Sequence, residues 1–193
     1  MILVVMAMNE EAKEILENQS SNKKVLLTGI GKVNAASKLS AFLATNQVDA
    51  IYNLGFAGAS KPYHVGDIVL IEKARYHDFD LTLFGYQKGQ VPGLPEAFES
   101  SRELLNHAKS VLTSFEIGQL FTGDYFMTEE KNESFIVDME GTALYHVAHQ
   151  FNIPILSIKV ISDVMGMDNH FDSYKKFERE FGAQTLLRIY QSL

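Results

Sequence analysis

The sequence of 193 residues contains no cysteine. It can therefore form no disulfide bond, bind no metal ion through thiolates and use no thiol nucleophile. A chain built without disulfides suits a reducing compartment, so we expect a cytoplasmic location. No apolar run reaches the roughly 20 residues of a membrane-spanning helix. The apolar residues 1–8 follow no basic segment, and we expect a first strand there instead of a signal peptide.

Positive charge is also scarce. There are 17 Lys and Arg against 24 Asp and Glu, giving a formal net charge of −7. Nucleic acids and anionic lipid surfaces attract basic proteins, so this balance argues against both as partners. Hydrophobic residues make up 46% of the chain, which supports one globular domain spanning residues 1–193.

Apolar segments of strand length alternate with segments of helical periodicity. This alternation predicts an α/β domain with a twisted, largely parallel (mixed) sheet flanked by helices. An irregular, aromatic-rich loop at 80–98 interrupts it, and loops of that length are usually functional or packed on a partner. We expect strands at 2–6, 24–28, 48–54, 67–73 (running on toward 77), 116–121, 135–140 and 151–163, and helices at 11–18, 32–45, 101–112, 141–150 and 172–192.

The predicted strand at 151–163 is apolar almost throughout and stops abruptly at Ser162 and Asp163. Such a run is typical of a strand buried on both faces of a parallel sheet, whose carboxyl end lies where α/β folds bind ligands. The preceding strand ends in Glu140, and Glu11 follows the first strand. Each acid alone could simply cap the next helix. Together with glycines at other strand ends, they predict a binding crevice with Glu140 and Asp163 side by side.

Several familiar cofactor and metal motifs are missing. Residues 29–31 read Gly-Ile-Gly, but Asn34 stands where a dinucleotide fingerprint has its third glycine. His146 and His149 share one face of a predicted helix, but no acid at ligand spacing accompanies them. We therefore expect no metal site and no cofactor.

Short motifs in a fixed order span nearly the whole chain. With them the sequence resembles the 5′-methylthioadenosine/S-adenosylhomocysteine nucleosidases of the purine nucleoside phosphorylase superfamily. That family hydrolyses the N-glycosidic bond of 5′-substituted adenine nucleosides and releases adenine. The motifs include Ala-Met-Asn-Glu-Glu at 7–11, Gly-Ile-Gly-Lys-Val at 29–33, Asn-Leu-Gly-Phe-Ala-Gly at 53–58, Ala-Arg-Tyr-His-Asp at 74–78, Met-Glu at 139–140 and Ile-Ser-Asp-Val at 161–164.

The resemblance implies a role for each matching residue. Asp163, oriented by Ser162, would protonate purine N7, and Glu11 would deprotonate the attacking water. Glu140 would bind the ribose diol, with Met139 packed under the sugar. The other implied contacts are stacking of adenine on Phe126, backbone hydrogen bonds from Met127 to its edge, and a 5′ pocket lined by Met8 and Ile30.

The resemblance further implies a homodimer. Residues 80–95, with Leu81, Phe84 and Pro92, would reach into the 5′ pocket of the neighbouring subunit. Tyr174 or Phe171, near the start of the last helix, would close that pocket.

The chain departs from the family pattern at two positions. Phe56 replaces a usual serine and Lys159 a usual arginine, and both of the usual residues help to hold the attacking water. The segment between the first helix and Gly29 is also shorter. Two alternatives therefore stay open: a phosphate-dependent purine nucleoside phosphorylase, and a protein that binds adenine nucleosides with little turnover.

Overall fold

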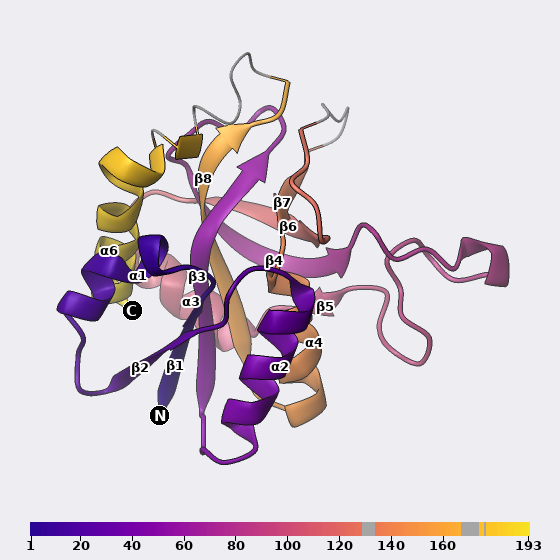
Figure 1. Ribbon diagram of the computed structural model, residues 1–193, viewed down its shortest axis with the longest axis horizontal. Coiled ribbons are helices and arrows are strands. Elements are labelled where there is room, and N and C mark those ends of the chain that lie inside the picture. The colour runs from indigo at the N-terminus through magenta and orange to yellow at the C-terminus, as the bar shows by residue number, and fades with distance from the viewer. Residues whose placement is uncertain (129–133, 167–173, 176) are drawn as a thin grey trace.

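A mixed sheet of eight strands organises the fold (Figure 1). The computed structural model describes residues 1–128, 134–166, 174–175 and 177–193. The strands and helices follow the order that hydrophobic periodicity predicts, with boundaries that differ by a few residues. The strands are β1 (Ile2–Met6), β2 (Lys23–Leu27), β3 (Ala50–Ala59), β4 (Ile68–Tyr76), β5 (Phe98–Glu99), β6 (Glu116–Thr122), β7 (Ile136–Asp138) and β8 (Ile155–Val164).

Five of these strands close into a ring. β8 pairs in parallel with β3 and antiparallel with β4. β6 pairs in parallel with β4 and with β7, and β7 closes the ring antiparallel to β3. β1 and β2 extend the sheet beyond β3, and β5 borders β4. β7 and β8 therefore each have neighbours on both sides, and Glu140 and Asp163 near their ends line the same cavity.

Helices cover both faces of β3 (Figure 1). The successive residues Ile51 and Tyr52 point to opposite faces, as side chains on a strand must, and belong to separate core clusters. One cluster packs against α2 (Lys32–Leu43) and α4 (Gly141–Phe151), the other against α1 (Asn9–Glu17), α3 (Arg102–Val111) and α6 (Ala183–Ser192). None of the helices in the described ranges is long and apolar enough to cross a membrane.

Strand β3 runs five residues further than predicted, through the glycine-rich stretch at 55–58. Glycine is required at two of these positions because carboxylates approach the backbone closely. A Cβ atom at Gly55 would lie 2.8 Å from Oε1 of Glu11, and one at Gly58 would lie 2.8 Å from Oδ2 of Asp163. The carboxylates of Glu11 and Asp163, both predicted from strand ends, therefore lie against the same strand, β3.

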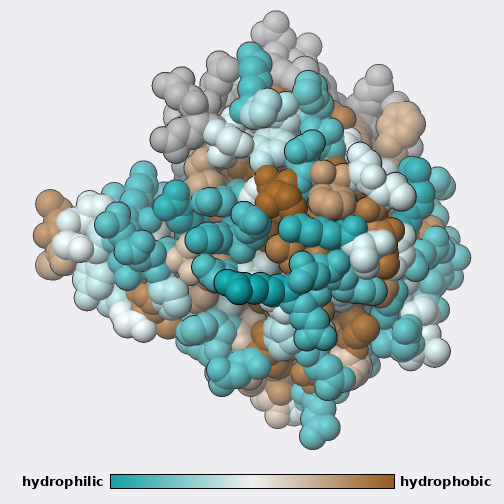
Figure 2. Space-filling view, turned by 180° about the vertical axis from the view of Figure 1, so that it is seen from behind, coloured by the Kyte–Doolittle hydropathy of each residue, from teal (hydrophilic) through white to brown (hydrophobic). Residues whose placement is uncertain are grey.

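Residues 80–95, which we call the arm, leave the sheet between β4 and β5 and project to the right in Figure 1. The arm contains the short 3₁₀ helix η1 (Thr82–Phe84). Leu83 and Phe84 are 97% and 76% exposed, and Figure 2 shows hydrophobic side chains at the tip of the arm. The tip of the arm is thus apolar and exposed, whereas Val91 and Leu94 of the arm pack against the core of the same chain.

Candidate active site

A cavity of about 280 Å³ lies among the ends of β3, β7 and β8 and the starts of α1 and α4. Its volume is near the lower end of the range of small-molecule sites, which begins at ~300 Å³. Phe84 and Pro92 lie on the arm and do not line it, and Phe171 falls outside the described residues. The other predicted site residues all line the cavity: Met8, Glu11, Ile30, Phe126, Met127, Met139, Glu140, Ser162, Asp163 and Tyr174.

Glu11 is fixed by the backbone around it. Its Oε1 accepts a hydrogen bond from the N–H of Phe56 at 2.8 Å, and Oε2 accepts from the N–H groups of Ala7 and Met8 at 3.2 and 3.1 Å. The hydrogen bond from Met8 caps the helix that contains Glu11, which is the structural role expected of an acid at this position. The hydrogen bond from Phe56, 45 residues away, is not part of helix capping and ties Glu11 to strand β3. Burial raises the pKa of Glu11, although the charge of Lys159 and the three N–H groups oppose the change.

Asp163 is the next-to-last residue of β8 and lies beside Gly58. Its side chain is buried, and Oδ1 accepts a hydrogen bond from the hydroxyl of Ser162 at 2.6 Å. The Ser162 hydroxyl also lies 3.2 Å from the carbonyl oxygen of Ala57. A shift of register between β3 and β8 at Ala57 and Gly58 brings Asp163 opposite Gly58. Strand pairing therefore turns this carboxyl into the cavity.

Glu140 precedes α4, but it does not cap its helix with its side chain. Its Oε1 instead accepts a hydrogen bond from the N–H of Gly31 at 2.8 Å. Gly31 has φ of 95°, a conformation that glycine adopts without strain. Burial, with the nearby charge of Asp138, raises the pKa of Glu140 to about 7. This carboxyl thus changes its charge near neutral pH.

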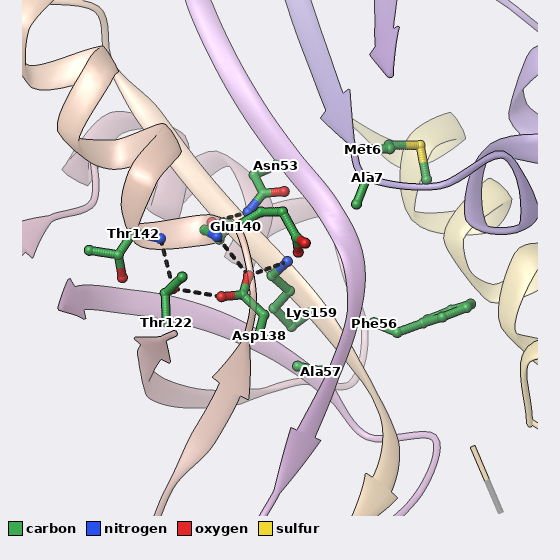
Figure 3. Close-up of polar contacts among 12 residues, drawn as sticks. Met6, Ala7, Asn53, Phe56, Ala57, Thr122, Asp138, Glu140, Thr142 and Lys159 are labelled. Carbon is green, nitrogen blue, oxygen red and sulfur yellow. Dashed lines mark hydrogen bonds and ion pairs between the residues drawn. The ribbon is translucent and has the colours of Figure 1, made fainter. Parts of the chain in front are cut away.

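An ion pair buried behind these acids joins Asp138 on β7 to Lys159 on β8 (Figure 3). The Nζ atom of Lys159 lies 2.9 Å from Oδ2 of Asp138. That carboxylate also accepts hydrogen bonds from the Thr122 hydroxyl and the N–H of Gly141, at 2.6 and 2.9 Å. Burial disfavours the charge on Lys159, but the carboxylates of Asp138, Glu11 and Glu140 outweigh it and raise its pKa. One ammonium group therefore balances three acids.

Phe56, the first departure from the family pattern, points its ring away from the polar cluster (Figure 3). The ring packs edge-on against Phe177 with centroids 5.5 Å apart. It also fills the space beside Gly182, where a Cβ atom would lie 2.3 Å from Cζ of Phe56. The residue contributes its backbone N–H to Glu11 and its side chain to the packing of the C-terminal helix.

Aromatic and thioether groups form the open side of the cavity. Phe126 and Tyr174 meet edge-on with centroids 6.0 Å apart. The hydroxyl of Tyr174 lies 3.9 Å from the sulfur of Met8 and donates to Oε1 of Glu178 at 3.0 Å. Ile30 and Phe126 are about half exposed. Such a face suits a flat apolar ring and a thioether.

The two histidines considered as metal ligands have other contacts. His146 stacks on Phe98, and its Nδ1 lies 3.1 Å from the hydroxyl of Tyr76. His149 meets the same phenyl ring edge-on. Among the described residues, no group of three or more His, Cys, Asp or Glu side chains is placed to hold a metal ion.

Sequence reasoning missed Asp138 and Lys175, which also line the cavity. The sequence does contain a signal for Asp138. It lies in an apolar segment two residues before Glu140, and Lys159 lies in a second apolar segment. Charges in buried strands need a partner, so the two could have been paired. Lys175 carries no comparable signal, since it reads as an ordinary charge on an amphipathic helix.

Comparison with known proteins places this geometry in a family. Residues 2–189 match the phosphorylase superfamily. A protein of Borrelia burgdorferi B31, assigned to the 5′-methylthioadenosine/S-adenosylhomocysteine nucleosidases and bound to adenine, is 31% identical, with a TM-score of 0.89 and coverage of 100% of both chains. The Streptococcus pneumoniae nucleosidase, bound to the transition-state inhibitor MT-ImmA, is 30% identical, with a TM-score of 0.86 and coverage of 99% of this chain and 98% of that one.

A third similar structure is the Neisseria meningitidis nucleosidase in complex with methylthio-immucillin-A. It is 28% identical, with a TM-score of 0.87, and the match covers 100% of this chain and 99% of that one. Both the superfamily match and the two relatives at 30% identity or more extend over almost the full chain. The chain therefore belongs to the phosphorylase superfamily and, within it, to the 5′-methylthioadenosine/S-adenosylhomocysteine nucleosidases.

Proposed function

We propose that this protein hydrolyses the N-glycosidic bond of 5′-methylthioadenosine and S-adenosylhomocysteine and releases adenine. The observation that carries the proposal is the convergence of Glu11, Glu140 and Asp163 on one cavity. A protein that merely binds nucleosides has no need of a buried acid held by three backbone N–H groups, as Glu11 is. The similar nucleosidases bound to adenine and to transition-state inhibitors support the same substrate class.

In this mechanism Asp163 gives a proton to N7 of adenine while the bond from N9 to the ribose carbon breaks. The bonding electrons leave with adenine, and the sugar becomes an oxocarbenium ion. Water attacks the sugar carbon and loses its proton to Glu11. Glu140 holds the ribose diol and Met139 packs under the ring. Phe126 stacks on the purine, and Met127 offers its backbone to the purine edge. The products are adenine and a 5-substituted ribose.

Charge in the cavity favours water over phosphate as the nucleophile. A phosphate dianion placed beside Lys159 would lie among the carboxylates of Glu11, Asp138 and Glu140, all of which affect the pKa of that lysine. Like charges at such short range are strongly unfavourable in a buried site. The ring of Phe56, which points away from the polar cluster, offers no hydroxyl to a phosphate.

The test is adenine release from both nucleosides, measured with and without phosphate. We expect the same rate in each case and no ribose 1-phosphate. The variant Asp163→Asn should turn over both adenine nucleosides about 10²- to 10⁴-fold more slowly, because this is the usual contribution of general acid catalysis. A nucleoside with p-nitrophenol in place of adenine should be much less affected, because its leaving group needs no proton. Equal slowing of both substrates would make Asp163 a structural cap.

A second variant tests the base. Glu11→Gln keeps the shape of the side chain and removes its basicity, so adenine release should fall while nucleoside binding remains. Adenine release at the parent rate would contradict the assignment. Binding without turnover in the parent protein would favour the binding-protein alternative.

The assembly and cellular role follow from the same reasoning. A homodimer in which Phe84 and Pro92 of the arm cover the partner's cavity would shield the exposed apolar groups at its mouth, among them Ile30 and Phe126. A cytoplasmic location suits a chain without cysteine. Both substrates carry a sulfur-containing 5′ group related to methionine, so the reaction would serve methionine salvage.

A further inference from the structure

Lys175 stands at the cavity mouth, on the side of the apolar 5′ pocket. It follows Tyr174, whose hydroxyl reaches the sulfur of Met8, and it lines the cavity itself. In the described part of the chain, Lys175 is the one cationic residue that lines the cavity. Lys159 is buried in its pair with Asp138, whereas the Lys175 side chain is 46% exposed. A charged group entering from solvent would therefore meet Lys175 first.

Lys175 is held in place together with a carboxylate. Its Nζ atom lies 2.9 Å from Oε2 of Glu178 and 5.3 Å from the ring centroid of Tyr174. The other oxygen of Glu178 accepts the hydrogen bond of the Tyr174 hydroxyl. The Glu178 side chain is 8% exposed. An ordinary surface pair three residues apart has both partners in water. Here the acid is buried, and the lysine is one of the residues that line the cavity.

We propose that Lys175, positioned by Glu178, binds the charged amino-acid tail at the 5′ end of S-adenosylhomocysteine. This inference rests on the proposed function and adds a determinant of substrate choice. The tail is a zwitterion, and the lysine would contact its α-carboxylate, while Glu178, which does not itself line the cavity, holds the lysine in place. The methylthio group of methylthioadenosine is uncharged and gains nothing from either residue.

The need for such a cation follows from the charge of the cavity. Glu11, Asp138, Glu140 and Asp163 all line it, and a substrate carboxylate approaching them meets several acids. Lys175 offsets that field at the mouth, where the tail would lie. A partly exposed charged contact is worth about a five- to tenfold change in affinity. The side chain should therefore raise kcat/KM for the charged substrate by about that factor.

The experiment compares kcat/KM for three substrates in the full-length protein: S-adenosylhomocysteine, methylthioadenosine and 5′-butylthioadenosine. The last has a longer uncharged tail and separates bulk from charge. Lys175→Met should lower the value for S-adenosylhomocysteine about five- to tenfold and leave the other two within about twofold. Lys175→Arg should keep most of the parent preference. Lys38→Met, an exposed lysine on α2 outside the cavity, is the matched control and should change nothing.

Salt gives an independent readout. Raising the ionic strength from about 0.05 M to about 0.5 M should reduce the preference for S-adenosylhomocysteine in the parent protein and not in Lys175→Met. Equal losses for all three substrates would show that Lys175 supports the packing of Tyr174, and would overturn the inference. So would an unchanged preference in Lys175→Met.

Failure of the inference can be told apart from failure of the proposed function. If the parent protein released adenine from none of the nucleosides, the proposed function would be wrong. Calorimetric binding of S-adenosylhomocysteine and methylthioadenosine to the parent and Lys175→Met would then decide the inference alone. Loss of affinity confined to the charged nucleoside supports it, and equal affinities in the two proteins refute it.

Discussion

Among the described residues of the site, Asp138 and Lys159 form the most deeply buried ion pair. Removing one partner of a buried pair leaves an uncompensated charge, which costs about 3–5 kcal/mol. Lys159→Met should therefore lower the free energy of unfolding by about that amount, as measured by urea denaturation. The double variant Lys159→Met with Asp138→Asn removes both charges and should recover part of the loss. A single variant as stable as the parent would show that Asp138 is solvated in solution.

Glu140 should make stability depend on pH in a defined direction. Its pKa of about 7 exceeds the ordinary value of 4.5, so the folded protein keeps a proton that the unfolded chain releases between these values. The loss of unfolding free energy that comes from ionising this residue is absent below about pH 4.5 and complete above about pH 7. Relative to Glu140→Gln, the parent protein should lose about 1–3 kcal/mol of unfolding free energy between pH 5 and about pH 8. A constant difference across that range would contradict the expected pKa.

At the level of elements, the junction between η2 (Glu178–Gly182) and α6 depends on Phe56. Gly182 has ordinary helical angles, so alanine there is favoured by helix propensity, by about 1 kcal/mol. Its Cβ would nevertheless lie 2.3 Å from Cζ of Phe56. Overpacking of this kind costs about 1–3 kcal/mol. We expect Gly182→Ala to lower the melting temperature and, by moving the backbone N–H of Phe56, to lower turnover.

Adding Phe56→Leu to Gly182→Ala removes the ring atoms that the new Cβ would meet. The double variant should be more stable than Gly182→Ala alone. If the two changes were simply additive, the close contact would not be the cause of the loss, and another explanation would be needed.

The order of strands and helices was predictable from the sequence because apolar spacing is a local property. The predictions for β1, for the extension of β4 toward His77 and for α4 agree with the structure to within a residue or two. The closed ring was not predictable, since the pairing of β8 with both β3 and β4 depends on contacts between distant segments. The π-helical turn of η2 was missed for a similar reason: it accommodates the ring of Phe56, which lies over 120 residues earlier.

The candidate site was predicted more fully than the sheet that carries it. Glu11, Glu140 and Asp163 were identified from their places at strand ends and from the family resemblance, and they meet in one cavity. The consequence of Phe56 could not be inferred, because the sequence does not reveal that its backbone serves the site while its ring serves the core. Lys175 escaped notice because its position depends on how the last helix packs.

For the whole molecule, the exposed arm predicts that the protein assembles into a dimer. Phe84 is 76% exposed near the arm tip, beside the fully exposed Leu83. We expect the parent protein to be a dimer by light scattering at micromolar concentration and Phe84→Asp to be a monomer with weaker nucleoside binding. Val65→Asp, which alters an exposed apolar residue away from the arm, should remain dimeric. A monomeric parent, or a dimeric Phe84→Asp, would remove the arm from the interface.

The ring of strands also constrains how the chain can be made. β8 fits between β3 and β4, yet it leaves the ribosome about 100 residues after β3, which takes roughly 5–20 s at ~5–20 residues per second. During that interval β3 and β4 lack the strand that joins them, and unpaired strand edges invite association between chains. A nascent polypeptide halted before residue 155 would keep these edges open permanently. Such truncated products should aggregate or be degraded, and chaperones that cover strand edges should matter most during this part of translation.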